Sequence, residues 1–237
     1  MAKAHEKWTV LPHKSIEEIS PHVRRVEGNV PGMPLKRVMT LIKRQSGGLV
    51  VHNAMALDDT SMKALDRWGP VELLVVPNGY HRLDAKIFKD RYPNAKVVCP
   101  AGARKKVEEV VPVDLTYDEF PSDDVVRVET LDGTNRAEGV LVVTEPEGTT
   151  LVFNDALFNM PHVSGMQGFV LKHLTSSTGG PKLSRIIRLF IIKDKAAFRG
   201  HFERLATLPN LARAIVSHHE TITGDVGGVL RQVASTV

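Results

Sequence analysis

Three apolar segments of this chain each run into polar side chains that can bind a proton or a metal ion. They read VVPNGYH at 75–81, LVFND at 151–155 and AIVSHH at 214–219. Polar groups at the carboxyl ends of buried strands converge on one rim of a sheet, where open α/β folds bind ligands. Imidazole and carboxylate groups suit zinc, iron or manganese, so the three strand ends together predict a metal or ligand site.

Each of these residues also has an ordinary structural explanation. A single histidine after a strand, such as His81, is commonly a hydrogen-bonded residue of the core or the surface. Asp155 precedes Ala-Leu-Phe and could cap a helical turn. The metal hypothesis therefore depends on the three segments occurring together and not on any one of them.

The first segment resembles the opening motif of the metallo-β-lactamase-fold superfamily, in particular a branch with a Pro-Asn-x-x-His motif. In the superfamily this motif is His-x-His-x-Asp-His, followed by a helix and a YPNA-like start to the next strand. The chain has YPNA at 92–95, which aligns His81 with the last histidine of the motif. Val76, Asn78 and Tyr80 then occupy the positions of the family's two earlier histidines and its aspartate.

The other two segments resemble later motifs of the same superfamily. The bridging aspartate of its GDALF-like stretch corresponds to Asp155 in the sequence NDALF. Its closing histidine corresponds to His218, with His219 as the alternative. The turn at 131–135 (LDGTN) contains no histidine, whereas the family has a Gly-His turn there. The resemblance extends over residues 38–219.

This resemblance implies that one of the family's two metal sites is absent and that the other is reduced. The expected ligands of the second site are His81, Asp155 and His218, which would hold one divalent ion (zinc, iron or manganese) or none. Asp84 lies one helical turn from His81 and could replace the aspartate lost at Tyr80. We expect it instead to orient His81 as a hydrogen-bond acceptor. Asn78, Tyr80 and Asp84 are thus the expected catalytic or supporting residues.

The pattern of apolar and turn residues predicts a layered α/β protein with mixed sheets. Strands are expected at 37–43, 48–53, 71–76, 96–99, 125–131, 139–144, 149–153 and 214–217. Helices are expected from the capping residues 58–60 to residue 67, and at 85–92, 184–192, 194–207 and 225–234. The resemblance implies a single domain over residues 1–237, a four-layer αββα sandwich of two mixed β-sheets. Residues 158–193 would be a loop and helix region inserted over the site.

The composition restricts the classes of function. The net charge of +4 comes from scattered basic residues with only 5% aromatics, which gives no support to a nucleic-acid partner. One cysteine, Cys99, excludes an internal disulfide and a cysteine-based zinc site. No signal-like or membrane-spanning apolar run occurs, so we expect a cytoplasmic protein with a small-molecule substrate and no membrane partner. The oligomeric state cannot be read from the sequence.

Two functions are compatible with these observations. The first is a mononuclear metal-dependent hydrolase of an ester, a thioester or a phosphoester. The second is a non-catalytic, metal-free binding or scaffold protein on the same fold. One basic group stands apart from the site: Lys182, Arg185 and Arg188 recur at spacings of three. Solvation of a helix face explains this spacing, and a rim that attracts anions is the alternative.

Overall fold

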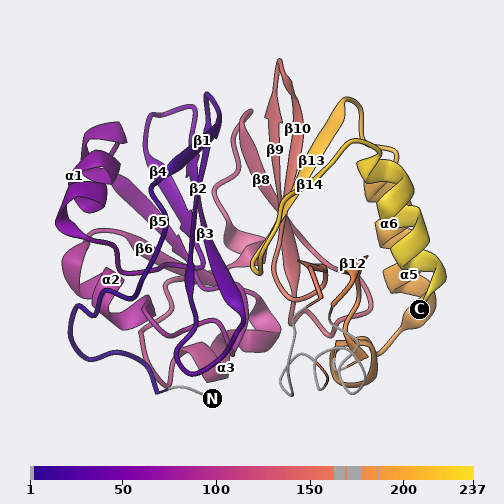
Figure 1. Ribbon diagram of the computed structural model, residues 1–237, viewed down its shortest axis with the longest axis horizontal. Coiled ribbons are helices and arrows are strands. Elements are labelled where there is room, and N and C mark those ends of the chain that lie inside the picture. Colours follow the sequence, from indigo (N-terminus) through magenta and orange to yellow (C-terminus); the bar gives the residue numbers. More distant parts are fainter. Residues whose placement is uncertain (1–2, 163–168, 170–177, 186) are drawn as a thin grey trace. The chain divides into compact units, whose positions relative to one another are not determined.

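A computed structural model describes residues 3–162, 169, 178–185 and 187–237 of the chain (Figure 1). The chain divides into two compact units, Met1–Val128 and Glu129–Val237, and each is described by itself. The expected single domain over 1–237, with an insertion at 158–193, stays a prediction. Part of that insertion lies outside the described residues.

The first unit is built on a seven-stranded mixed sheet whose strands follow one another in chain order. The strands are β1 (Glu17–Ser20), β2 (Val23–Asn29), β3 (Lys36–Lys43), β4 (Leu49–His52), β5 (Val71–Val75), β6 (Lys96–Cys99) and β7 (Leu115–Thr116). The first four strands pair antiparallel. The pairs from β4 to β7 are parallel. The carboxyl ends of β4 and β5, which precede Asn53 and Val76, therefore point the same way.

Helices pack on one face of this sheet (Figure 1). They are α1 (Asp59–Trp68), α2 (Ala85–Arg91) and α3 (Arg104–Val107), with the short 3₁₀ turns η1 (Ala101–Ala103) and η2 (Tyr117–Glu119). The Asp58 carboxylate accepts the Ser61 N–H at 2.8 Å and so caps α1. Residues on one face of strands β2 to β6, such as Leu49 and Val51 of β4, enter one apolar core together with Phe88 of α2.

The second unit contains a five-stranded sheet in the order β14-β13-β10-β9-β8. The strands are β8 (Val126–Thr130), β9 (Gly139–Glu145), β10 (Gly148–Phe153), β13 (Leu211–Val216) and β14 (Ile222–Thr223). β8 begins in the last residues of the first unit and continues into the second. β10 pairs parallel with β13, and Phe153 lies opposite Val216 at their carboxyl ends. A separate pair is formed by β11 (Phe158–Met160) and β12 (Gly180–Lys182).

Two helices cover one face of the second sheet, α5 (Lys195–Leu205) and α6 (Val226–Ser235) (Figure 1). Both begin at a capping aspartate, Asp194 and Asp225. The apolar core between sheet and helices includes Phe153, Phe198 and Phe202, whose rings contact one another. A single π-helical turn, η3 (Ile187–Ile191), precedes α5.

All predicted strands, and all predicted helices except the one at 184–192, are confirmed. The short elements β7, β11, β12, β14 and α3 were not predicted. The N-terminal strands β1 and β2 were not predicted, because their alternating charged residues lack a continuous apolar run. The helix expected at 184–192 is instead a π-helical turn, in which the Ile192 N–H donates to the Ile187 carbonyl at 3.0 Å. Among the described residues, no helix is both long enough and apolar enough to cross a bilayer.

Candidate metal centre

His81 lies in a turn that Asn78 shapes. The buried Asn78 side chain accepts hydrogen bonds from the backbone N–H groups of Tyr80, at 2.8 Å, and His81, at 3.0 Å. An asparagine that bonds the backbone two residues ahead imitates a reverse turn, which explains the tight exit from β5. Asn78 therefore presents His81 through the backbone, while Tyr80 projects outward with 58% of its surface exposed.

The ring orientation of His81 is determined by Asn53, which directly follows β4. The Asn53 amide nitrogen donates to the Val38 carbonyl at 2.8 Å, so its oxygen faces the other way. That oxygen lies 3.1 Å from His81 Nδ1, which must therefore carry the proton and donate it. In this tautomer Nε2 of His81 has the lone pair that a metal ion requires.

Asp84 was expected to accept a hydrogen bond from the His81 ring, but its carboxylate contacts Arg37 and His5 instead. Its carboxylate is buried and lies 2.8 Å from Arg37 Nη2 and 2.6 Å from His5 Nδ1. It also accepts the Ala56 N–H at 3.0 Å. The acceptor for the His81 ring is thus Asn53, and Asp84 anchors Arg37 and the N-terminal segment.

In the second unit, Asp155 and His218 lie side by side. They follow the paired ends of β10 and β13, so the parallel register brings them together. Asp155 Oδ1 is 3.2 Å from His218 Nε2, and both residues are buried. Two ligands that bind one tetrahedral ion at about 2.0–2.2 Å are roughly 3.3 Å apart. The spacing of this carboxylate and this imidazole therefore fits a shared cation.

His218, and not His219, is the histidine that faces Asp155. Its ring stacks on Phe158 with ring centres 5.2 Å apart and an angle of 9° between the planes. His219 has a positive φ of 65° and a backbone bridge to Asn159, which places it in the turn after the site. The stack on Phe158 restricts rotation of the His218 imidazole and so preorganises it.

A small pocket opens beside His81 within the first unit. It has a volume of about 220 Å³ and includes the side chains of Val30, Met33, Leu35 and Leu83. These four side chains are apolar. The polar side chains of Arg37, Asn53 and Tyr80 also line the pocket. A space of this size next to His81 has room for a short apolar group.

Three titratable residues of the first unit have strongly shifted pKa values, and one of them is Tyr92, whose pKa burial raises to about 12. Burial lowers the pKa of His52 to about 3, and the neighbouring His81 acts in the same direction. Burial raises the pKa of Cys99 to about 12, which makes a nucleophilic thiolate unavailable at neutral pH. His52 is thus a neutral core histidine, and Cys99 is a buried apolar residue.

Sequence reasoning missed three residues that support the His81 side of the site: Asn53, Arg37 and His5. Asn53 had a usable signal, because an asparagine directly after an apolar strand can adopt the left-handed conformation, here with φ of 57°. No local sequence pattern indicated Arg37 or His5, because each contacts Asp84 from a distant part of the chain.

Comparisons with known proteins give a likeness in structure only. No protein-family model matches the sequence, and no curated protein matches it. The metallo-β-lactamase FIM-1 from Pseudomonas aeruginosa, in its mono-zinc form, is 13% identical, with a TM-score of 0.61 over 96% of each chain. The DIM-1 metallo-β-lactamase is 10% identical, with a TM-score of 0.63 over 95% of this chain and 99% of that one.

These two likenesses agree with the mixed α/β composition and the two large mixed sheets. They confirm the fold class expected from the sequence, although identities of 10% and 13% carry no information on the reaction. The chain has the fold of the metallo-β-lactamases.

Proposed function

We propose that His81, Asp155 and His218 together hold one divalent cation and that the protein is a metal-dependent hydrolase. The observation that carries the proposal is the buried contact of 3.2 Å between Asp155 Oδ1 and His218 Nε2. Two imidazoles and a carboxylate form a ligand set that leaves coordination positions for water or substrate. FIM-1 is described in a mono-zinc form, so a one-ion state occurs on this fold.

The donor atoms of each unit suit this role. Asn53 keeps the proton of His81 on Nδ1 and leaves the lone pair on Nε2. Phe158 holds the ring of His218. A bound divalent ion would polarise a carbonyl or phosphoryl oxygen and make water nucleophilic near neutral pH. Zinc, iron and manganese all accept these ligands, and the proposal covers all three.

The proposed substrates are esters, thioesters or phosphoesters with a short apolar group. The support for the apolar group is the pocket of about 220 Å³ that includes Val30, Met33 and Leu35 beside His81. Tyr80, at the same pocket, presents an amphipathic ring to whatever binds there. A cytoplasmic location, and partners limited to a small-molecule substrate, belong to the same proposal.

The alternative is a non-catalytic, metal-free protein on the same fold. The Asp155–His218 contact is also compatible with this alternative, because an imidazole N–H and a carboxylate oxygen at 3.2 Å pair without a cation. The two functions differ in one measurable property, which is the metal content.

Elemental analysis of protein purified without a chelator tests the proposal. We expect about one ion per chain in the wild type and in His22→Ala, a histidine variant of the first unit whose Nδ1 lies 2.6 Å from the Lys43 carbonyl oxygen. The variants His81→Ala and Asp155→Ala should lose the ion while keeping a native circular dichroism spectrum. A wild type that holds no ion, even after incubation with zinc, iron and manganese, would establish the scaffold alternative.

An activity panel then tests the reaction class. Metal-loaded wild type is assayed on aryl esters, acyl thioesters and phosphodiesters with short apolar groups. We expect hydrolysis of at least one class that Asp155→Ala abolishes. A metal-bound protein that is inactive on all three classes would contradict the hydrolase proposal and leave a metal-binding protein.

A further inference from the structure

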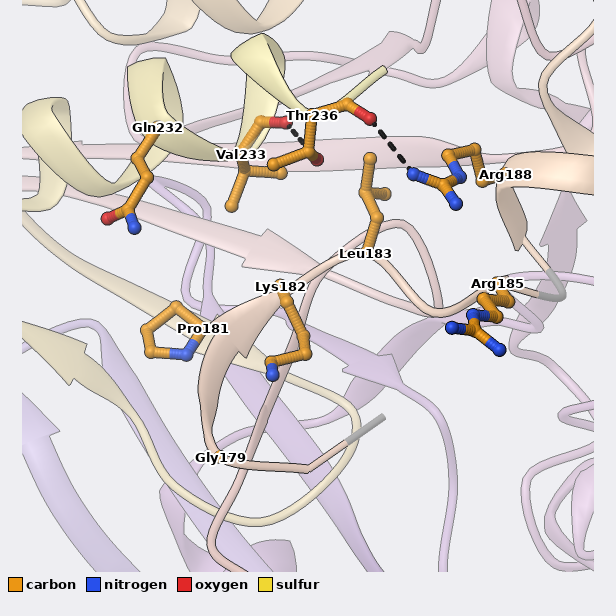
Figure 2. Close-up of a pocket in the computed structure, with 9 residues that line it drawn as sticks. All are labelled: Gly179, Pro181, Lys182, Leu183, Arg185, Arg188, Gln232, Val233 and Thr236. Atoms are coloured by element: carbon orange, nitrogen blue, oxygen red, sulfur yellow. Dashed lines mark hydrogen bonds between the residues drawn. The ribbon is translucent and has the colours of Figure 1, made fainter. Parts of the chain in front are cut away.

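A second pocket lies wholly within the second unit. It has a volume of about 450 Å³, which falls within the range of roughly 300–1,000 Å³ usual for ligand sites. One wall is formed by β12 and the residues that follow it, and the other by the last turns of α6 (Figure 2). Lys182, Arg185 and Arg188 come from the first wall, and Gln232 and Thr236 from the second.

The pocket has a strong excess of positive charge. Three cationic side chains line it, and no aspartate or glutamate is among its lining residues. The sequence from 178 to 193 contains no acidic residue, and the first one after it, Asp194, caps α5. The backbone of Lys182 pairs with Phe158 of β11, but its side chain has no hydrogen bond or ion pair with any residue in the part of the chain that the structure describes.

The end of α6 offsets only a small part of this charge. Arg188 Nη1 donates to the Thr236 carbonyl at 3.2 Å, as Figure 2 shows. The C-terminus of a helix carries roughly half of one negative charge, against three positive side chains. The next oxygen, that of Val237, accepts from Arg199 Nη2 at 2.7 Å and so has its own partner.

We infer that this pocket binds a small polyanion, whose phosphate or carboxylate groups are held by Lys182, Arg185 and Arg188. Arginine presents a planar fork of donors that matches either kind of oxyanion. The Gln232 amide can donate to an uncharged oxygen of the ligand. The Thr236 hydroxyl donates to the Val233 carbonyl at 2.7 Å, so it can only accept.

The inferred polyanion site is separate from the proposed metal centre. None of its lining residues is a proposed metal ligand, and its charge does not depend on a bound cation. Arg185 is exposed, and Lys182 and Arg188 are half-buried. Lys182 belongs to β12, so the spacing of Lys182, Arg185 and Arg188 does not describe one solvated helix face. The pocket that they share favours recognition of an anion.

Calorimetric titration of the full chain tests this inference. Pyrophosphate and citrate are the two probes, because they carry similar charge on phosphate and on carboxylate groups. The protein is first treated with a chelator and then dialysed, so that no cation at the metal centre can bind either probe. We expect saturable binding of at least one probe that weakens as the salt concentration rises.

Matched variants locate the binding. The double variant Lys182→Gln/Arg185→Gln removes two lining charges. The double variant Lys193→Gln/Lys195→Gln removes two exposed charges from residues outside the lining. We expect the first to raise the dissociation constant at least about tenfold and the second to change it less than about twofold.

The relative affinities identify the ligand class. Tighter binding of pyrophosphate would assign a phosphate-bearing ligand, and tighter binding of citrate a polycarboxylate. No saturable binding of either probe, or equal losses in the two double variants, would overturn the inference. A native circular dichroism spectrum of each variant excludes unfolding as the cause of a loss.

Discussion

Replacing Asp84 by alanine should destabilise the first unit strongly, because it removes the partner of a buried guanidinium. The side chains of Arg37 and Asp84 are 6% and 0% exposed, and Arg37 Nη2 lies 2.8 Å from the carboxylate. Burial lowers the pKa of Arg37, while the charge of Asp84 and its hydrogen bond act in the opposite direction. In Asp84→Ala the Arg37 charge stays buried without compensation, and the His5 ring and the Ala56 N–H also lose their acceptor.

The expected cost follows from the burial of this ion pair. Removing one partner of a buried pair costs about 3–5 kcal/mol. With a urea dependence of about 2 kcal/mol per M, the unfolding midpoint of the first unit should fall by roughly 2 M. Both tryptophans of the chain, Trp8 and Trp68, belong to this unit, so their fluorescence follows its unfolding selectively.

The control is Asp90→Ala, which breaks an exposed ion pair with Lys86 at 2.6 Å on α2. Its midpoint should shift by less than about a fifth of the Asp84→Ala shift, because exposed pairs contribute little. Equal shifts in the two variants would refute the reasoning. So would an Asp84→Ala variant that is as stable as the wild type but inactive, since that result would assign Asp84 to the reaction instead of to the anchoring of Arg37.

Two further predictions concern single residues. Glycine at position 53 tolerates the positive φ, but Asn53→Gly removes the acceptor for His81 Nδ1. The affinity for zinc should therefore fall roughly 10–100-fold, as measured by a competition titration with a chelating dye. Unchanged affinity would mean that Asn53 does not position His81. Gly133→Ala should lower the melting temperature more than Gly224→Ala, although both glycines have positive φ. A Cβ at Gly133 would lie 2.1 Å from the Asp194 carbonyl oxygen, whereas Gly224 has nothing within 4 Å. Equal melting temperatures in differential scanning calorimetry would contradict this account.

The part of the site that the sequence predicted best is the pair at the ends of β10 and β13. Each strand is a short apolar run followed at once by a ligand-type residue, Asp155 or His218. Parallel pairing of two such strands brings their carboxyl ends together. The local pattern and the sheet geometry therefore both predict that Asp155 and His218 lie side by side. The choice between His218 and His219 needed the coordinates, because a turn after a strand can direct either side chain towards the neighbouring strand end.

The role of Asp84 was not accessible from the sequence. Its spacing from His81 favoured a contact on one helix face, but its carboxylate bonds instead to Arg37 and His5. These partners are separated from it by 47 and 79 positions, and no periodic pattern encodes a contact between segments so far apart.

Whereas the αββα sandwich was implied by the family resemblance, the sequence by itself indicated a layered α/β protein, the main strands and helices, and the residue types available for binding a cation. These properties are local, since they depend on apolar periodicity, capping residues and the polar groups that end each strand. Only the tertiary structure decided that Asn53 sets the tautomer of His81, and that Lys182 and Arg185 share a pocket with the end of α6. Such partners come from different parts of the chain, and their contacts exist only once burial and hydrogen bonding have selected one packed arrangement.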